Sequence, residues 1–217
     1  MNKPAEKNDL REQKTKKALR SALFTLLEKK HYSSITISDL VRIANVSRGA
    51  FYFHYYDIND FIEQVVKEEL DKIQIEIYSA IKDRSSPDTS VFDLLQLRMQ
   101  IYYDKVFECS EFYSLMHGPN VSPEVPEIIR TAGVDLMYND YIPLLLEEMH
   151  LPAFSQDVRH TLNPLSIAVE YLVAGQTSVT KACITHRFNY PTKELAKQIT
   201  ELTYSVLKSS ITIMAAK

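Results

Sequence analysis

Residues 47 to 54 contain side chains that can recognise the bases of a nucleic acid. They also contain small residues, which allow a nucleic acid to lie close to the backbone. Their sequence is Ser-Arg-Gly-Ala-Phe-Tyr-Phe-His. Arg48 can donate two parallel hydrogen bonds to guanine O6 and N7, and Phe53 can touch a thymine methyl group. Gly49 weakens a helix by about 1 kcal/mol relative to alanine, which favours a reason outside the helix for its presence. These residue types indicate contact with the edges of bases.

A second group of residues has the chemistry of a metal site. Glu147 and His150 have the E-x-x-H spacing of helical-bundle di-iron proteins, and Asp157 and His160 resemble a second such pair. The break at Leu151-Pro152 separates the two pairs, and a histidine near a helix C-terminus is stabilised by the helix dipole without metal. We therefore expect no metal site, and a helical metal enzyme is the weaker alternative.

The sequence contains no Walker-type phosphate loop, no GxSxG motif and no HExxH motif. Nucleotide hydrolysis and serine or zinc hydrolase chemistry therefore have no support. We predict that the protein is not an enzyme, has no catalytic residues and needs no cofactor.

Two short helices and a tight turn are predicted to position the base-reading segment. Thr36 and Asp39 form a T-x-x-D capping pattern, and apolar residues follow at helical spacing up to Ala44. Asn45 tolerates the left-handed conformation that ends a helix, and Ser47 is a suitable N-cap for the next one. A longer helix, predicted over 14–30, precedes them. The pattern is typical of a helix-turn-helix, whose second helix enters the major groove of DNA.

The second helix of this motif has two different sides when it is projected at about 100° per residue. Phe51 and Tyr55 fall on one side, whereas Gly49, Tyr52 and Phe53 fall on another. In our interpretation the second side faces DNA. In the alternative interpretation, Tyr52 and Phe53 pack against the first helix and Gly49 has no special role.

The rest of the chain predicts six more helices and no strand. They are expected at 57–83, 91–107, 111–116, from about 123 to 150 with a bend at Pro143, at 163–187, and from 191 close to the C-terminus. We predict an all-α fold of about nine helices. Residues 1–56 form a three-helix DNA-binding head whose first ten residues are a flexible arm. Residues 57–217 form a larger helical bundle for ligand binding and dimerisation.

Charge is distributed unevenly between these two parts. Residues 1–56 contain 11 Lys and Arg against 5 Asp and Glu, whereas 57–217 contain 14 against 23. A basic head on an acidic body favours a DNA-binding module joined to a second domain, although a solvated basic arm without a partner has the same signature. The sequence has no uninterrupted apolar run of about 18 residues and no apolar signal segment, so we expect a cytoplasmic protein that does not contact the membrane.

Residues 36–55, TISDLVRIANVSRGAFYFHY, resemble the DNA-binding signature of the TetR/AcrR family of transcriptional regulators. The likeness extends over about 14–66. It implies a sequence-specific DNA-binding regulator, expected to be a repressor that a small-molecule effector releases. The residues expected at the DNA are Lys14, Lys17, Thr36, Ser47, Arg48, Gly49, Ala50, Tyr52, Phe53 and His54.

The sequence departs from the family pattern at two positions. Asn45 stands where the family usually has glycine, a change that is compatible with a left-handed turn. Ile58 stands where the family often has a lysine that contacts phosphate, so one contact is expected to be missing, and Lys14, Lys16 and Lys17 are candidates to replace it. The missing lysine leaves open a co-regulator that acts through protein contacts.

The C-terminal half resembles a TetR-like domain frequent in Firmicutes, through LMHGPN at 115–120, YLVAGQ at 171–176 and RFNYPTKEL at 187–195. The resemblance implies a homodimer through the last two long helices, about 163–187 and 192–213. Such a dimer places its recognition helices about 34–36 Å apart and requires a near-palindromic double-stranded operator.

Aromatic, methionine and polar residues of the body are candidates to line an effector pocket, because buried tyrosines need hydrogen-bond partners. For any one of them, ordinary core packing is the alternative. The candidates are Met99, Tyr102, Tyr103, Phe107, Phe112, Met116, His117, Tyr138, Tyr141, Glu170 and Tyr171.

Overall fold

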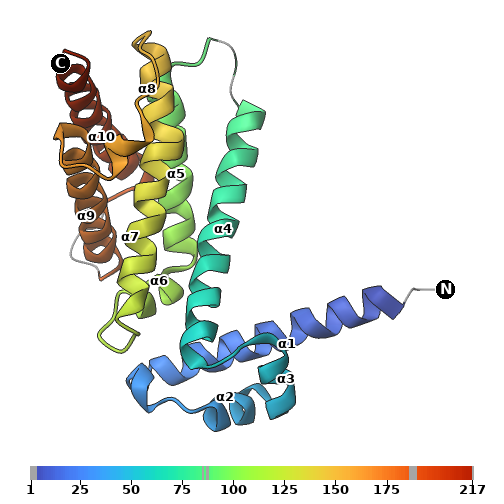
Figure 1. The fold of residues 1–217 in the computed structure, drawn as a ribbon. Coiled ribbons are helices and arrows are strands. Elements are labelled where there is room, and N and C mark those ends of the chain that lie inside the picture. Colours follow the sequence, from blue (N-terminus) through green and yellow to red (C-terminus); the bar gives the residue numbers. More distant parts are fainter. Residues whose placement is uncertain (1–3, 85, 87, 186–189, 217) are drawn as a thin grey trace. The chain divides into compact units, whose positions relative to one another are not determined.

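The computed structural model describes residues 4–84, 86, 88–185 and 190–216, and these residues form helices and connecting segments without a strand. The predicted all-α fold is therefore confirmed (Figure 1). The α-helices are α1 (Pro4–Leu27), α2 (Ile37–Ala44), α3 (Arg48–His54), α4 (Ile58–Arg84), α5 (Val91–Glu108), α6 (Ser110–Met116), α7 (Glu124–Leu136), α8 (Ile142–Glu148), α9 (Pro164–Ile184) and α10 (Thr192–Ala215).

The helix predicted from about 123 to 150 is a continuous helical path that contains α7, a π-helical turn at Met137–Tyr141, and α8. The backbone N–H of Ile142 donates to the carbonyl of Met137, five residues back. Pro143 follows directly; a proline has no N–H to donate and its ring clashes with the carbonyl four residues earlier. The wider π-helical turn accommodates this clash, so the irregularity lies before Pro143. Because α7, the π-helical turn and α8 together correspond to one predicted helix, the nine predicted helices are all present in the described part of the chain.

The chain forms two compact units. The first unit contains the residues up to Glu69 together with Ser114–Ile128, and the second contains Leu70–Tyr113 and the residues from Ile129 onward. The helices α4, α6 and α7 each contribute residues to both units. The division predicted at residue 56 concerns function and stays a prediction. None of the helices in the described ranges is long and apolar enough to cross a membrane.

The first unit is built around the apolar stripe of α1. Leu19 and Leu23 are completely buried, as are Leu40 of α2 and Phe61 of α4. At the edge of this core, Arg20 of α1 forms an ion pair with Glu69 of α4. Lys16 forms a second one with Glu68, whose oxygen lies 3.0 Å from the lysine Nζ. Apolar burial and two ion pairs thus join α1 to the first part of α4.

Helix α1 begins earlier than the sequence predicted. It starts at Pro4, so residues 4 to 10 are helical, and the flexibility expected of this arm stays a prediction. Proline is favoured in the first turn of a helix because its missing N–H has no intrahelical partner there. The segment that follows, Ala-Glu-Lys, consists of good helix formers.

The turn between α2 and α3 has the predicted chemistry. Asn45 has φ 53° and ψ 47°, which is the left-handed conformation, and it ends α2. Thr36 caps the start of α2 in a reciprocal capping box with Asp39. The Ser47 hydroxyl accepts a hydrogen bond of 3.1 Å from the N–H of Ala50 at the start of α3. These three predicted features are confirmed.

The segment between α6 and α7 belongs to the first unit through Asn120. Its side-chain amide donates to the Leu27 carbonyl at the end of α1 at 3.0 Å. Its own carbonyl accepts from the backbone N–H of Tyr32 at 2.8 Å. One asparagine therefore satisfies backbone groups at the end of α1 and in the connection to α2, groups that otherwise have no intrahelical partner.

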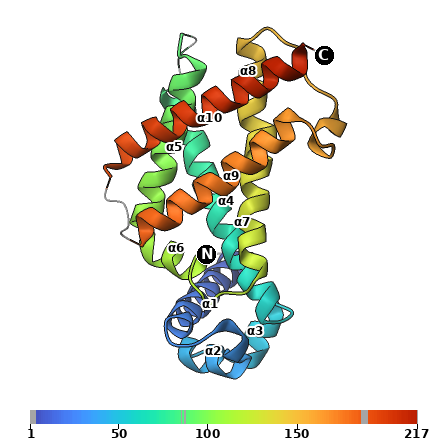
Figure 2. The same ribbon diagram turned by 90° about the vertical axis from the view of Figure 1, so that its left-hand side faces the viewer.

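In the second unit, α10 packs against α5 and α9 (Figure 2). The core there includes the fully buried side chains of Tyr103, Met137, Leu145, Leu165 and Leu207. Helix α9 begins close to the predicted residue 163, and Asn163 is its N-cap in a capping box with Ser166, followed by a proline in the first turn. These elements position the clefts described below.

The conformation of Asn45 generates a stability prediction. Asn45→Ala should lower the free energy of unfolding by about 1 kcal/mol, because a residue with a Cβ in the left-handed region costs about 1–2 kcal/mol and alanine lacks the local hydrogen bonds that help asparagine. Asn45→Gly should remain within about 0.5 kcal/mol of the parent chain, because glycine adopts this conformation freely. Urea unfolding followed by circular dichroism measures both, and equal loss in the two variants would contradict the role of this turn.

Candidate nucleic-acid interface

Helix α3 separates its aromatic residues into a buried side and an exposed side. Phe51 and Tyr55 are 0% and 2% exposed, and their ring centroids lie 5.8 Å and 4.6 Å from that of Phe61. Tyr52 and Phe53 are 56% and 73% exposed. The alternative in which Tyr52 and Phe53 pack against the first helix is therefore wrong. A seven-residue helix that exposes two large rings presents an apolar, aromatic surface to its surroundings.

Gly49 lies on the exposed side of α3 and meets no packing constraint inside the protein. A Cβ built on it would have one neighbour within 4 Å, the Ser47 hydroxyl at 3.8 Å. The internal structure therefore tolerates a side chain at this position. Packing inside the protein therefore gives no reason for glycine at this position.

Arg48 is exposed and is oriented by a residue that sequence analysis did not identify. Its Nη2 donates to the Ser38 hydroxyl of α2 at 2.8 Å. The hydrogen bond holds one corner of the guanidinium and leaves its other donors for a partner outside the chain. Ser38 precedes Arg48 by ten residues and lies on another helix. The only sequence signal for this role was the presence of an exposed hydroxyl side chain in α2.

The hydroxyl of Thr36 is already engaged inside the protein. It donates to Asp39 Oδ2 at 2.8 Å and accepts from the Asp39 N–H at 3.1 Å. Lys30 Nζ lies 2.7 Å from the same carboxylate oxygen. The hydrogen bond from Lys30, followed by those from Thr36, holds the pKa of Asp39 well below its usual range. A phosphate contact by Thr36 therefore has to compete with Asp39.

The other expected DNA residues lie on the same unit. Lys14 and Lys17 of α1 are exposed, whereas Lys16, which we considered as a substitute cation, binds Glu68. His54 is half-buried, and its ring packs edge-on against Phe53 with a centroid separation of 4.9 Å. Ala50 and Ile58 are also half-buried. All ten predicted DNA residues thus belong to the first unit, and eight of them have exposed side chains or backbone.

A cleft of about 380 Å³ lies entirely within the second unit. Residues of α4, α5, α7, the π-helical turn and α9 line it. Gly133 of α7 allows the close approach of α9, because a Cβ there would lie 2.9 Å from Val173 Cγ1. Such an overlap requires the Val173 side chain to move, so glycine at this position allows α7 and α9 to lie close together at the wall of the cleft.

A polar network lies at the wall of this cleft. Arg98 of α5, 4% exposed, donates to Asp140 Oδ2 at 2.9 Å. The Tyr78 hydroxyl donates to Asp140 Oδ1 at 2.6 Å, and Gln74 Nε2 donates to Oδ2 at 3.2 Å. Burial raises the pKa of Tyr141 to about 12 against the opposing effect of Arg98, so the Tyr141 hydroxyl keeps its proton at neutral pH. This network was not predicted from the sequence.

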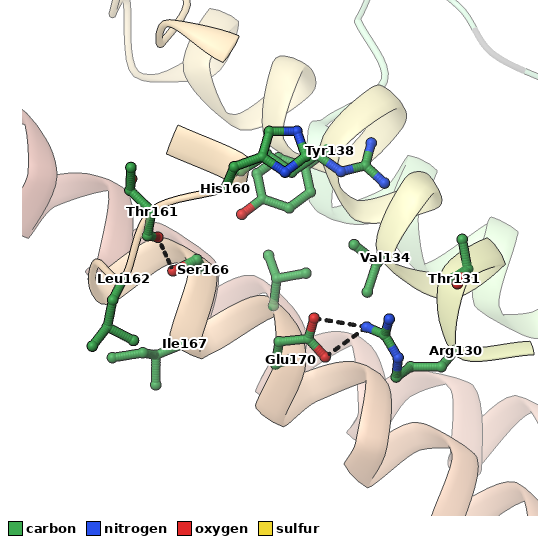
Figure 3. A pocket seen from close by; sticks show the side chains of 12 residues that line it. Arg130, Thr131, Val134, Tyr138, His160, Thr161, Leu162, Ser166, Ile167 and Glu170 are labelled. Atoms are coloured by element: carbon green, nitrogen blue, oxygen red, sulfur yellow. Dashed lines mark hydrogen bonds and ion pairs between the residues drawn. The ribbon is translucent and has the colours of Figure 1, made fainter. Parts of the chain in front are cut away.

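A second, more open pocket of about 590 Å³ lies between α7, the segment before α9, and α9 itself (Figure 3). Arg130 and Glu170 face each other across it, with Arg130 Nη1 at 2.8 Å and 3.0 Å from the two carboxylate oxygens. Tyr138 and His160 also line this pocket (Figure 3). Its rim includes Leu162, which is 90% exposed.

The predicted effector-pocket residues are divided among several places. Met99, Tyr102 and Tyr141 line the first cleft, and Tyr138 and Glu170 line the open pocket. Tyr103, Phe107 and Phe112 are buried or half-buried in the second unit. Met116 and His117 belong to the first unit, and Tyr171 is 74% exposed on α9. The structure therefore brings three of the candidates together around Arg98.

The residues considered as metal ligands do not gather. Glu147, His150, Asp157 and His160 have exposed side chains. His150 has φ 55° and follows the last turn of α8, where its N–H donates to the Glu147 carbonyl at 3.1 Å. Within the described ranges, three or more His, Cys, Asp or Glu side chains never cluster as metal ligands would.

The last two helices carry an exposed face with few charges. On α9, Ile167 and Tyr171 are exposed together with Ala174 and Gly175, at helical spacing. A Cβ on Gly175 would meet no atom within 4 Å, so this part of the helix is open. On α10, Leu202 and Ile213 are 61% and 49% exposed, with Ser205 and Ser209 between them. Small and apolar residues on one face allow another helix to approach closely.

Solved structures of transcriptional regulators resemble this chain over most of its length. The fatty acid degradation regulator FadR from Bacillus halodurans aligns with a TM-score of 0.62 and 15% identity, covering 94% of this chain and 96% of that one. A TetR transcriptional regulator from Streptococcus agalactiae aligns with a TM-score of 0.56 and 21% identity, covering 92% and 98%. The dihydroxyacetone kinase operon activator DhaS aligns with a TM-score of 0.56 and 16% identity, covering 90% and 97%.

In sequence, an uncharacterized HTH-type transcriptional regulator of Bacillus subtilis, YxbF, is 35% identical over 66 residues. The match covers 30% of this chain and 17% of that protein, so it concerns a small part of the relative. No protein-family model matches the chain. The chain has the fold of TetR-family transcriptional regulators, and the resemblance predicted from the sequence is confirmed at this level.

The contacts of Asp39 generate a pH prediction. Because its pKa is lowered in the folded state, Asp39 stabilises the protein above its unfolded pKa of about 3.9, and this stabilisation is lost as the pH falls toward the folded pKa. Asp39→Asn should therefore lower the Tm at pH 7, and the difference from the parent chain should shrink below pH 4. Thermal unfolding between pH 7 and pH 3 measures it.

Lys30→Met supplies the control for this measurement. The lysine is the largest cause of the lowered pKa of Asp39, so in the Lys30→Met background the Asp39→Asn change should have a smaller and less pH-dependent effect. A Tm difference that stays constant from pH 7 to pH 3 in the parent background would show that Asp39 acts only as a neutral cap.

Proposed function

We propose that this chain, which has the fold of TetR-family regulators, is a transcriptional regulator that binds double-stranded DNA through α3. The observation that carries the proposal is the division of α3 into a buried side, Phe51 and Tyr55, and an exposed side with Arg48, Tyr52 and Phe53. In a helix-turn-helix the second helix enters the major groove with its exposed side against the bases. The positive net charge of residues 1–56 favours association with the phosphate backbone.

Each exposed residue of the head has a role that fits its geometry. Arg48, held at one corner by Ser38, is positioned to read a guanine in bidentate fashion. Tyr52 can donate to a phosphate, Phe53 can contact a thymine methyl group, and Gly49 allows the backbone to approach the bases. Lys14 and Lys17 of α1 are available for phosphates, and they compensate for the absence of a lysine at the start of α4.

The regulator acts as a homodimer through α9 and α10. The exposed face with Tyr171 and Gly175 on α9 and Leu202 on α10 supports this arrangement, because large apolar side chains on one helix face are covered in most stable proteins. A C2 dimer reads a near-palindromic operator with half-sites one helical turn apart. Each head exposes few cations, so two heads are needed for tight binding.

A small-molecule effector in the cleft around Arg98 releases the repressor from its operator. Two helices, α4 and α7, begin in the first unit and carry residues that line the cleft, so they offer a covalent path for linkage between the sites. The operon activator DhaS shows that proteins of this fold also activate transcription. A reporter gene behind the selected operator, with and without the protein, decides between repression and activation.

Selection of bound duplexes from a random pool tests the DNA proposal and yields the operator. On the selected operator, Arg48→Ala should lower the affinity roughly tenfold to a hundredfold and relax the preference at one base pair per half-site. Tyr52→Phe should weaken binding to all sequences alike, because it removes a phosphate contact. Fluorescence anisotropy at several salt concentrations measures both effects.

Arg130→Gln is the matched control, because it removes an arginine of the second unit that binds Glu170 instead of DNA. Its operator affinity should equal that of the parent chain. If neither head variant changes binding, α3 is not the recognition helix. If affinity does not depend on salt, the proposal of DNA binding fails and the co-regulator alternative gains support.

Gly175→Arg tests the dimer. The arginine has free space in the single chain and improves helix propensity by up to about 1 kcal/mol, so the variant should fold at least as well as the parent. In the dimer the long charged side chain prevents close approach of the helices. We expect a monomer in analytical ultracentrifugation and at least a tenfold loss of operator affinity. A variant that stays dimeric would place the interface elsewhere.

A further inference from the structure

The buried arginine of the cleft has donors that the protein does not use. Arg98 Nε is buried and has no hydrogen-bond partner among the residues that the structure describes. The guanidinium carries five N–H donors in a fixed plane; it donates to Asp140 and to the Tyr141 hydroxyl, and Nε is not used by either. A buried donor without an acceptor is costly, and Arg98 lines the cleft, so an acceptor that enters the cleft can stabilise this guanidinium.

The acceptor side of the network, in contrast, is occupied. Asp140 already accepts hydrogen bonds from Tyr78, Gln74 and Arg98, with both carboxylate oxygens engaged. An incoming cation therefore finds no free carboxylate at this point and has to displace a donor. What the network lacks is an acceptor oxygen, and an oxygen that carries negative charge makes the strongest hydrogen bonds to a guanidinium.

Two aromatic rings hold the guanidinium in place. The Arg98 Cζ lies 5.2 Å from the ring centroid of Tyr78 and 5.6 Å from that of Tyr141, distances at which a cation is attracted to the face of a ring. Its orientation is thus set before a ligand arrives, which lowers the entropy cost of binding. Beyond the network, the cleft is lined by apolar side chains such as Ile73, Met99 and Val173, with polar side chains such as Asp71, Asn139 and Gln176 among them.

We propose that the cleft binds a small organic carboxylate with an apolar body, and that Arg98 binds the carboxylate group. The inference rests on the proposed function in that it names the chemical class of the effector. Arg98 lies between two negative groups in the complex, Asp140 on one side and the ligand on the other. The protonated hydroxyl of Tyr141 offers a further donor beside it. The apolar wall accommodates a chain or ring of the ligand within about 380 Å³.

Titration calorimetry with the purified full chain tests the assignment. The probes are straight-chain carboxylates of six, eight and ten carbons, 4-phenylbutanoate, and the alcohols and amines of equal chain length. We expect at least one carboxylate to bind ten times more tightly than its matched alcohol and amine. The proposal is overturned if no carboxylate exceeds its matched alcohol, or if the amines bind most tightly.

Two variants separate recognition of the carboxylate from stability of the fold. Arg98→Gln together with Asp140→Asn removes both charges and keeps side chains that can hydrogen-bond, so a buried charge is not left unpaired. This double variant should bind the carboxylate and the alcohol within about threefold of each other. Asp140→Asn alone removes the neighbouring negative charge and should retain or strengthen carboxylate binding. Loss of binding in Asp140→Asn alone, with normal circular dichroism, would assign the ligand to Asp140 and contradict the role of Arg98.

Arg130→Gln in the open pocket is the matched arginine control and should leave the carboxylate affinity unchanged. Operator binding by each variant is measured without ligand in the same preparations. Failure of all preparations to bind DNA would contradict the proposed function and leave the carboxylate assignment standing. Normal DNA binding without preference for carboxylates would overturn the assignment alone.

Discussion

A helix of seven residues is not stable by itself in water, and the first unit is organised around this constraint. Helix α3 has to gain its stability from its surroundings: the Ser47 cap, the left-handed turn at Asn45, and the burial of Phe51 and Tyr55 against Phe61. Stabilisation from one side leaves the other side unconstrained. The exposed arc is therefore free to be selected for contacts with a partner, and it can expose two large rings without loss of the fold.

Asp39 performs two structural tasks at once in this head. Its carboxylate closes the capping box of α2 and binds Lys30 in the turn after α1, so a single side chain joins the start of α2 to the segment that follows α1. Helix α2 in turn carries Ser38, which orients Arg48. The position of Arg48, which we propose reads a base, thus depends on a short chain of polar contacts that begins with the Asp39 carboxylate.

The second unit contains the opposite arrangement, in which charge is buried. Desolvation of a buried ion pair often exceeds the attraction between its partners, so such a pair is weak support for stability and stronger support for a specific role. The Arg98–Asp140 pair is surrounded by Tyr78, Tyr141 and Gln74, and it lies at the wall of a cleft. A well-packed apolar cluster would serve the fold equally well. The proposed carboxylate ligand gives this polar network a role that an apolar cluster could not fill.

The sequence by itself determined the local features of this protein. Helical periodicity, the caps at Thr36, Ser47 and Asn163, and the turn at Asn45 depend on neighbours within four residues, and the all-α fold with a helix-turn-helix follows from them. Tertiary structure alone decided which distant polar groups meet. Arg98 and Asp140 are 42 residues apart, and Ser38 joins Arg48 from another helix. It also placed Tyr171 on an exposed face and His117 in the first unit. Periodicity identifies which side of a helix is apolar. Packing between helices determines which residues each side contacts, and these contacts cannot be inferred from spacing along the chain.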